Sequence, residues 1–177
     1  MRRNLVCLMF VCFAVLIDAV FDIVENVDLE NHPGNLFSTN LKYHGRIPRP
    51  ISGNITFLKD LTDKHRMSVD IKRIENGQMV DFPGLINRTI CKAIKLFYNP
   101  YLKTTLRTGK NTNLNFKKGK MCPLKKGTYW VKNIVYDVNK WKTYWWTPGS
   151  YYVNFTIFNE NGKPGGKIAF QIHLKEI

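Results

Sequence analysis

The sequence predicts an all-β fold, a two-sheet antiparallel β-sandwich with one short helix and one disulfide. Three observations predict it. Short segments of alternating apolar residues are separated by turn residues, one segment has helical periodicity, and a single pair of cysteines remains beyond an N-terminal leader. Six to eight strands with no internal repeat in 177 residues are typical of one sandwich domain.

The N-terminal segment, residues 1–19, has the pattern of a secretory signal peptide. Arg2 and Arg3 precede an apolar run that ends at Ile17, and Ala19 is a small residue suited to cleavage. The run is shorter than the ~20 residues that a membrane-spanning helix needs. We therefore predict that residues 20–177 form a single domain that is secreted and extracellular.

Alternation of apolar and polar side chains predicts the strands of the first half. Asn76-Gly77 has the composition of a tight hairpin turn, and Pro83-Gly84 is expected to end the strand that returns from it. The predicted strands are residues 21–25 (an edge strand), 36–43, 51–57, 66–72 and 79–82.

One helix is predicted after these strands, because apolar residues recur there at helical spacing. Pro100 is expected to close it and to push Asn99 out of the helical region. Residues 104–120 are polar and basic and are expected to form a long connection. The apolar positions of the helix are Ile90, Ala93, Ile94 and Phe97.

Strands are also predicted in the C-terminal third, where residues 151–157 and 168–174 alternate. In the strand that follows Gly127, Tyr129, Val131 and Val135 are expected to share one face. Between these strands lies a loop, residues 140–149, rich in aromatic residues: Trp141, Tyr144, Trp145 and Trp146.

Cysteine use agrees with secretion. Cys7 and Cys12 leave with the leader, so Cys91 has only Cys122 as an intrachain partner. Such a bond is expected to stabilise the fold by roughly 3–4 kcal/mol. Three glycosylation sequons, Asn-x-Ser/Thr, predict a glycoprotein. They begin at Asn54, Asn87 and Asn154.

Positive charge dominates the middle of the chain. The net charge is +14, and no acidic residue occurs from Phe82 to Tyr136. Such a block can meet an anionic membrane surface, an acidic extracellular partner or nucleic acid, or it can be a solvated basic face. Secretion and glycosylation argue against nucleic acid.

The sequence predicts no enzyme, cofactor or metal site. It has neither a Gly-x-Ser-x-Gly nor a His-Glu-x-x-His motif, and its histidines and cysteines lack metal-ligand spacing. Its acidic residues do not form a recognisable acid–base pair by spacing: Asp60, Asp63, Asp70, Glu75 and Asp81.

The segment that begins Cys122-Pro123 and continues through Gly127 and Tyr129 to Asn133 resembles a large insect family of secreted proteins of unknown function. Cys91 near a helix and the Pro148-Gly149 step extend the resemblance over roughly the C-terminal half. That family includes CheB-like chemosensory proteins and is thought to be related to ML-type lipid-recognition proteins and the ganglioside activator. The resemblance implies an ML-type, immunoglobulin-like sandwich whose sheets splay to hold an acyl chain or another apolar ligand.

The predicted function is therefore a non-catalytic binder or carrier of a lipid or other apolar small molecule, with a chemosensory role implied by the resemblance. Its pocket is mapped onto inward strand residues, with three tryptophans at the mouth. The alternative is an extracellular protein-interaction module with a closed core that uses its basic face and Trp-rich loop. The mapped residues are Tyr129, Val131, Phe155, Ile157, Phe170 and Ile172, with Trp141, Trp145 and Trp146 at the mouth.

Overall fold

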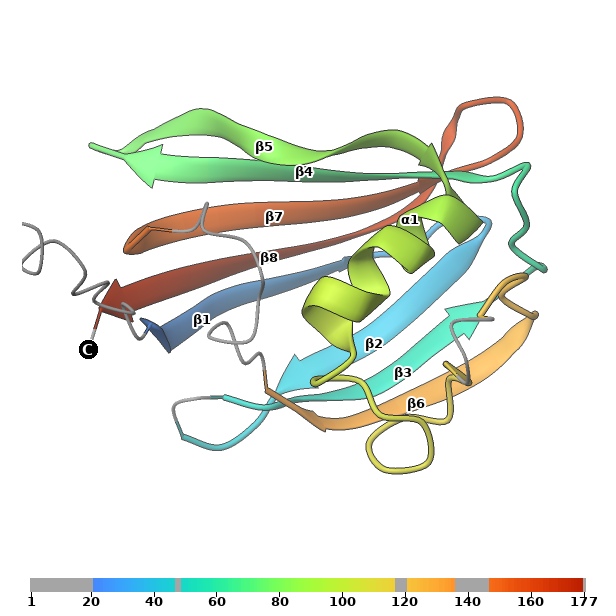
Figure 1. The fold of residues 1–177 in the computed structure, drawn as a ribbon, viewed down its shortest axis with the longest axis horizontal. Coiled ribbons are helices and arrows are strands. Elements are labelled where there is room, and N and C mark those ends of the chain that lie inside the picture. The colour runs from blue at the N-terminus through green and yellow to red at the C-terminus, as the bar shows by residue number, and fades with distance from the viewer. Residues whose placement is uncertain (1–20, 47–48, 117–120, 136–146, 177) are drawn as a thin grey trace, which may run out of the picture.

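The computed structural model describes residues 21–46, 49–116, 121–135 and 147–176. Within these ranges the chain forms two antiparallel sheets, one α-helix and one π-helical turn (Figure 1). The predicted fold class, a two-sheet antiparallel β-sandwich with one short α-helix and a disulfide, is confirmed. The predicted signal peptide, residues 1–19, lies outside the described residues. No helix of the described part is long and apolar enough to cross a membrane.

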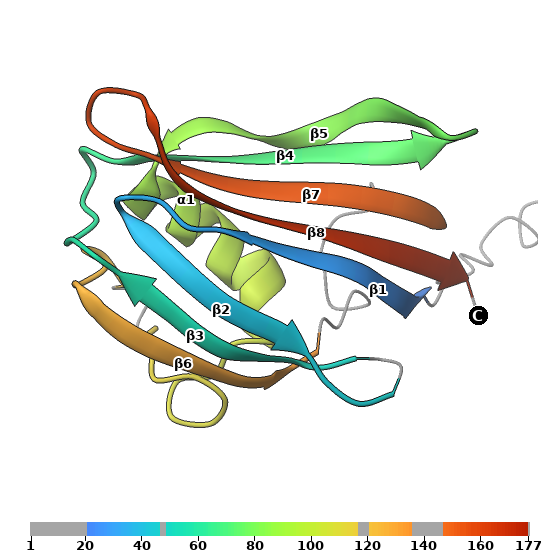
Figure 2. The same ribbon diagram turned by 180° about the vertical axis from the view of Figure 1, so that it is seen from behind.

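The five-stranded sheet has the strand order β1-β8-β7-β4-β5, and the three-stranded sheet has the order β2-β3-β6 (Figures 1 and 2). The strands are β1 (Phe21–His32), β2 (Phe37–Tyr43), β3 (Ile51–Phe57), β4 (Arg66–Glu75), β5 (Gln78–Thr89), β6 (Gly127–Ile134), β7 (Gly149–Phe158) and β8 (Pro164–Glu176). The helix is α1 (Ile90–Phe97), and the π-helical turn is η1 (Tyr98–Leu102).

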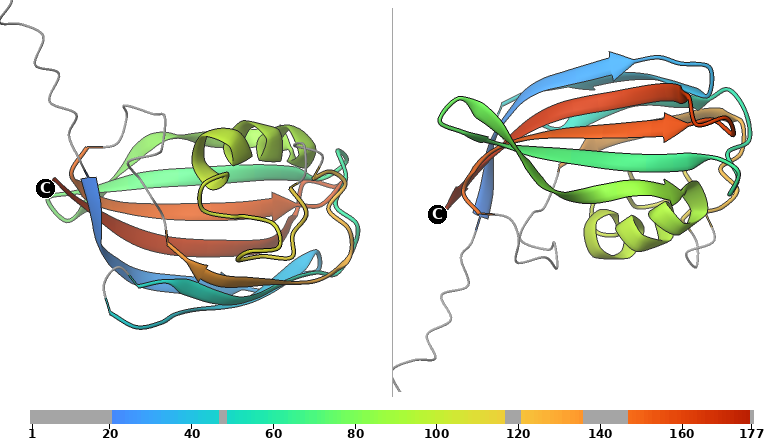
Figure 3. Two further views of the ribbon diagram at one scale, coloured as in Figure 1. Left: turned by 60° about the horizontal axis from the view of Figure 1, so that its bottom comes forward. Right: turned by 90° about the horizontal axis from the view of Figure 1, so that it is seen from above.

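The predicted alternation places the apolar side chains as expected in most strands. Tyr151 and Val153 of β7 are buried with Phe170, Ile172 and Leu174 of β8. These residues line one face of the five-stranded sheet, and α1 lies against that face (Figures 1 and 3). The Asn76-Gly77 hairpin is also confirmed, since both residues have the positive φ that its tight turn requires (50° and 78°).

The two sheets meet at the turn from β1 to β2. The Leu36 N–H donates to the Gly165 carbonyl (2.9 Å), and the Asn31 side-chain amide donates to the Leu41 carbonyl (3.2 Å). Farther along the chain, a disulfide joins Cys91 of α1 to Cys122, just before β6, and so ties the helix to the three-stranded sheet. The sandwich is therefore linked through both the β1–β2 turn and the helix.

Buried apolar residues form three clusters. The closed-end cluster joins both sheets to α1 and the segment before β6: Leu36, Phe37, Phe57, Leu61, Ile90, Leu114, Phe116, Leu124 and Ile157. The five-strand cluster comprises Val69, Ile71, Tyr151, Val153, Phe170, Ile172 and Leu174. The three-strand cluster comprises Leu41, Ile51, Val131 and Ile134.

The prediction that Pro83-Gly84 ends a strand is wrong, because β5 continues through both residues to Thr89. Val69 and Ile71 of β4 are two residues apart, whereas their partners on β5, Leu85 and Phe82, are three residues apart. β5 therefore has one extra residue here, which forms a bulge. β5 is the outermost strand of its sheet, where a proline without an N–H removes no bond to a further strand.

The expected break at Pro100 is also corrected. α1 does end at Phe97, but the chain continues as the π-helical turn η1, which contains Asn99 and Pro100. The Lys103 N–H donates to the Tyr98 carbonyl five residues earlier (2.7 Å). This wider turn relieves the clash that a proline ring makes with the carbonyl four residues before it.

The predicted inward face of β6 holds for Val131 but not for Val135, which is exposed. Ile134 is buried instead. On β3, Ile51 and Gly53 are two residues apart, while their partners Ile134 and Val131 are three apart. Asn133 has a φ of 51°, so a left-handed residue at this bulge reverses the alternation.

Candidate ligand-binding site

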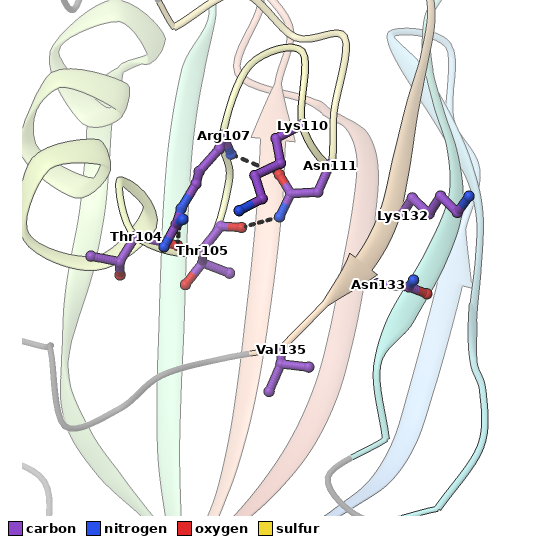
Figure 4. A pocket seen from close by; sticks show the side chains of 8 residues that line it. All are labelled: Thr104, Thr105, Arg107, Lys110, Asn111, Lys132, Asn133 and Val135. Carbon is purple, nitrogen blue, oxygen red and sulfur yellow. Dashed lines mark hydrogen bonds between the residues drawn. The ribbon is translucent and has the colours of Figure 1, made fainter.

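A hollow of about 460 Å³ lies between the loop after η1 and the end of β6 (Figure 4). We call it the basic pocket. The loop contributes Thr104, Thr105, Arg107, Lys110 and Asn111, and the β6 side contributes Lys132, Asn133 and Val135. Figure 4 shows the side chains of the loop on one side and Lys132 and Asn133 on the other, with the Lys132 side chain directed away from the loop.

Asn111 fixes the shape of the loop that forms one wall. Its side-chain Oδ1 accepts a hydrogen bond from the Arg107 N–H (2.7 Å), and its Nδ2 donates to the Thr105 carbonyl (2.6 Å). The Lys110 N–H donates to the Arg107 carbonyl (3.0 Å), closing a turn between the two cations. An asparagine that bonds to nearby backbone in this way is a common means of holding a turn.

The same loop is hydrogen-bonded to β6. The Thr112 hydroxyl donates to the Trp130 carbonyl (2.9 Å), and the Trp130 N–H donates to Asn113 Oδ1 (2.7 Å). The Lys132 N–H donates to the Asn111 carbonyl (2.8 Å). β3 lies on the other side of β6, so the loop satisfies the edge that the sheet leaves open. Both walls of the basic pocket are therefore fixed relative to each other.

Below the pocket the loop enters the apolar interior. Leu106 packs against both the closed-end and the three-strand clusters. Its carbonyl accepts a hydrogen bond from the Tyr98 hydroxyl (3.5 Å), and the Tyr98 ring stacks on Phe116 with centroids 4.3 Å apart. Burial raises the pKa of the Tyr98 phenol, so this hydroxyl stays a hydrogen-bond donor.

Electrostatically, the pocket is cationic. Arg107, Lys110 and Lys132 line it without an acidic side chain, and both of its walls belong to the acid-free stretch of the sequence. Among the described residues, the ion pairs lie elsewhere and none includes these three cations. The next acidic residue along the chain, Asp137, lies outside the described residues.

One polar group in the pocket wall is unusual. Thr105 is 3% exposed, yet within the described structure its Oγ1 has no hydrogen-bond partner. Its neighbour in the loop, Thr112, is equally buried but both donates and accepts through its hydroxyl. An unpaired buried hydroxyl is costly, so the Oγ1 of Thr105 is an unusual feature of this wall.

The pocket residues that the sequence mapped onto the interior do not form one wall. Phe155 and Phe170 stack with centroids 5.6 Å apart, and Ile172 belongs to the same five-strand cluster. Ile157 lies instead in the closed-end cluster, and the partly buried Tyr129 packs against that cluster. Val131 lies in the three-strand cluster.

The remaining predicted residues are placed as follows. Trp141, Trp145 and Trp146 lie outside the described residues. The expected disulfide between Cys91 and Cys122 is present. Of the sequon asparagines, Asn54 and Asn87 are exposed, whereas Asn154 is half-buried with an Oδ1 that lacks a partner in the described structure. Modification of these asparagines stays a prediction.

Sequence reasoning missed the loop wall of the basic pocket, because it read residues 104–120 as a polar connection. Thr105, Thr112, Leu114 and Phe116 are in fact buried. The available signal was charge, since Arg107, Lys110 and Lys132 all fall in the acid-free stretch. No group of three potential metal ligands occurs among the described side chains.

Comparison with known proteins gives one family. Residues 65–153 match the family described as protein of unknown function (DUF1091). A solved structure of a Niemann-Pick type C2 protein from the Japanese carpenter ant aligns with 84% of this chain and 96% of its own, at 16% identity and a TM-score of 0.30. A likeness that weak carries no inference about function. No curated protein matches the chain.

Proposed function

We propose that this chain, which belongs to the family described as protein of unknown function (DUF1091), is a secreted, non-catalytic binder of a lipid or other apolar small molecule. The ligand would lie between the two sheets, against the face that carries the five-strand cluster. Carriage of the ligand and a chemosensory role follow from the resemblance to CheB-like proteins and belong to the same proposal.

The observation that carries this proposal is the separation of the apolar clusters. In a filled sandwich the inner faces of the two sheets interdigitate as one core. Here the five-strand cluster contains no described residue of β2, β3 or β6. The partly buried residues packed against it come from the same sheet (Met67, Phe155, and Phe82 and Leu85 of its edge strand β5) and from α1 (Phe97). Of the described side chains of the five-stranded sheet, which exclude residues 21–29 of β1, Ile168 alone packs against the three-strand cluster.

Away from the closed end, the two apolar faces are therefore not each other's main packing partners. Ligand pockets are lined by the residue types that these faces present, with a few polar groups at the rim. The basic pocket supplies such groups at the side where the loop after η1 meets β6. Val135 follows β6, and Thr147 precedes β7 of the other sheet. The Trp-rich segment therefore connects the two sheets along the chain, which is consistent with the proposed aromatic mouth.

The test is native mass spectrometry of the protein secreted from insect cells, followed by organic extraction. A discrete lipid or hydrocarbon that leaves the protein on denaturation is the expected result. Replacing Trp141, Trp145 and Trp146 together by alanine should reduce uptake while the fold is kept, because the rings are proposed to serve the mouth. A ligand-free mass that persists after incubation with a panel of lipids would contradict the proposal.

An extracellular protein-interaction module with a closed core is the second candidate. One observation favours it: Tyr151, Ile172 and Leu174 of the five-strand cluster are at most 1% exposed, as in a filled core. In that case the basic face and the Trp-rich loop would contact an acidic partner. A protein that remains ligand-free but binds an acidic extracellular protein in a salt-dependent manner would favour this second function.

A further inference from the structure

Trp130 is an unusual residue on the outer face of the three-stranded sheet, in which β3 lies between β2 and β6 (Figure 2). The other described side chains that alternate with the buried ones on these strands are polar: Ser38, Asn40, Lys42, Ser52, Asn54, Thr56, Thr128 and Lys132. Trp130 is 38% exposed among them, and the aromatic contacts of the described residues involve other rings. Its indole therefore offers an open apolar surface on a polar face.

The strand register places a glycosylation sequon directly beside this indole. Asn54 of β3 is opposite Trp130 of β6, and it begins the sequon Asn54-Ile55-Thr56. Opposite residues of an antiparallel pair point to the same face of the sheet. Asn54 is exposed, and its side-chain amide makes no hydrogen bond to the residues that the structure describes. The amide nitrogen that a sugar would be attached to is therefore free.

Backbone hydrogen bonds show that these two side chains have the closest spacing that a sheet allows. The Trp130 N–H donates to Asn113 Oδ1 (2.7 Å), and the Trp130 carbonyl accepts from the Thr112 hydroxyl (2.9 Å). Both backbone groups therefore point away from β3, so Asn54 and Trp130 form a non-hydrogen-bonded pair. The Cβ atoms of such a pair lie toward the short end of the range of about 4.5–5.5 Å.

We propose that Asn54 carries an N-linked glycan whose first N-acetylglucosamine stacks on the Trp130 indole. The modification joins Nδ2 of Asn54 to C1 of the sugar. The bond from C1 to the oxygen of a polyprenyl diphosphate donor breaks, the diphosphate leaves with the electron pair, and Nδ2 loses one proton. The secretory route supplies this donor, so the inference rests on the secretion in the proposed function but not on lipid binding.

The spacing suits one sugar ring on one indole. C1 of the sugar lies three bonds beyond the Cβ of Asn54, so the ring begins beside the indole of Trp130. A pyranose presents several C–H groups on one of its faces, and the negative face of an aromatic ring attracts such groups. Stacking also removes the exposed apolar surface of the indole from water.

The other two sequons lack this arrangement. Asn154 of β7 is half-buried, and its Oδ1 is enclosed without a partner in the described structure. The residues opposite Asn154 are Asp70 and Ala169, neither of which is aromatic. Asn87 is exposed, but its Oδ1 accepts a hydrogen bond from the Arg66 Nε (2.6 Å). The Asn87 sequon is therefore a control for a glycan without a stacking partner.

The test uses variants secreted from insect cells: wild type, Asn54→Gln, Trp130→Thr and the double variant. Peptide mapping by mass spectrometry measures the occupancy of Asn54, and calorimetry measures each melting temperature. Trimming with an endoglycosidase that leaves one N-acetylglucosamine tests whether the first sugar is sufficient. A matched control set uses Asn87→Gln in place of Asn54→Gln.

Asn54 should be occupied, and Trp130→Thr should lower the melting temperature of the glycosylated protein by about 2–4 °C, because the sugar loses its stacking surface. The same substitution should have little effect in the Asn54→Gln background and its full effect in the Asn87→Gln background. Trimmed wild type should melt at the same temperature as untrimmed protein. Its proton–carbon NMR spectrum should show sugar C–H protons shifted upfield by the indole ring current, and Trp130→Thr should abolish that shift.

An unmodified Asn54 in the secreted protein would overturn the inference, as would an equal loss of stability from Trp130→Thr with and without the Asn54 glycan. If Trp130→Thr is not secreted, the spectrum of trimmed wild type decides, because sugar signals without an upfield shift exclude stacking. A ligand-free protein with a stacked sugar would contradict lipid binding and leave this inference standing. A lipid-loaded protein with an unmodified Asn54 would do the reverse.

Discussion

The Thr112 hydroxyl donates a hydrogen bond of 2.9 Å to the backbone carbonyl of Trp130 and accepts one from the Leu114 N–H (3.1 Å). Thr112 is fully buried, so one buried side chain satisfies two backbone groups. This pair holds the loop after η1 against β6, and the basic pocket lies between those two elements.

Thr112→Val should therefore lower the free energy of unfolding by about 2 kcal/mol, because it keeps the shape of the side chain but removes the hydroxyl that pairs with the Trp130 carbonyl and the buried Leu114 N–H. Urea unfolding followed by tryptophan fluorescence measures the change. Thr105→Val is the matched control. The Thr105 Oγ1 has no partner in the described structure, so its loss should be neutral or slightly stabilising. Equal destabilisation by the two substitutions would contradict this assignment.

Cys91 and Cys122 have Cα atoms 5.4 Å apart and enclose a separation of 31 residues. Cys91→Ser should lower the free energy of unfolding by roughly 3–4 kcal/mol, because the unfolded chain regains the entropy of an open loop. For a domain of this size the melting temperature should fall by about 10 °C.

The controls for the disulfide are Cys122→Ser and the double variant. All three should melt at the same temperature, because each removes the same bond, and calorimetry without reductant measures it. Wild-type protein with reductant should approach them. A melting temperature of Cys91→Ser equal to that of the oxidised wild type would show that the bond contributes nothing to stability.

Most strands could be predicted from the sequence, because apolar alternation and turn residues act locally. The prediction was wrong at positions whose conformation depends on tertiary structure. Pro83 lies within a strand because β5 is at a sheet edge, and Val135 points outward because the bulge at Asn133 reverses the alternation. Neither the neighbour of a strand nor the position of a bulge is encoded in periodicity.

The basic pocket could not be predicted from the sequence for a similar reason. Its walls are more than twenty residues apart in the sequence, and the hydrogen bond of Lys132 to Asn111 that joins them is made by backbone groups. Charge counting identified the cations but not which of them line one hollow. The disulfide, in contrast, was predictable because only two cysteines remain beyond the expected leader.

Gly53 of β3 tests the close contact between β2 and β3. Its φ is 142°, and a Cβ placed on it would overlap the carbonyl oxygen of Asn40. Gly53→Ala should lower the free energy of unfolding by about 2 kcal/mol or more, from backbone strain together with the overlap. Gly45→Ala, at a φ of 70° with open space around it, should cost only about 1 kcal/mol. Urea unfolding of both variants decides, and a smaller effect at Gly53 than at Gly45 would argue against this strand contact.

The stability of the fold is expected to depend on pH through Asp60, whose carboxylate is bonded to the segment that follows Cys122. The Lys125 ammonium donates to its Oδ2 (2.8 Å) and the Lys126 N–H donates to its Oδ1 (2.7 Å), and these bonds lower the pKa of the Asp60 carboxyl. A carboxyl group whose pKa is lowered by folding adds stability above its unfolded-state pKa of about 3.9 and loses it as the pH falls through the folded value.

Asp60→Asn should therefore be less stable than wild type at pH 7, and the two proteins should converge as the pH falls from about 5 toward 2. The urea midpoint measured across this range gives the comparison. Salt should reduce the difference at pH 7, because the carboxylate is exposed and its attraction to Lys125 is screened. Asp63→Asn, an exposed aspartate three residues away, is the control for the loss of one negative charge. A constant difference between Asp60→Asn and wild type from pH 7 to pH 2 would mean that the hydrogen bonds of Asp60 do not link stability to its ionisation.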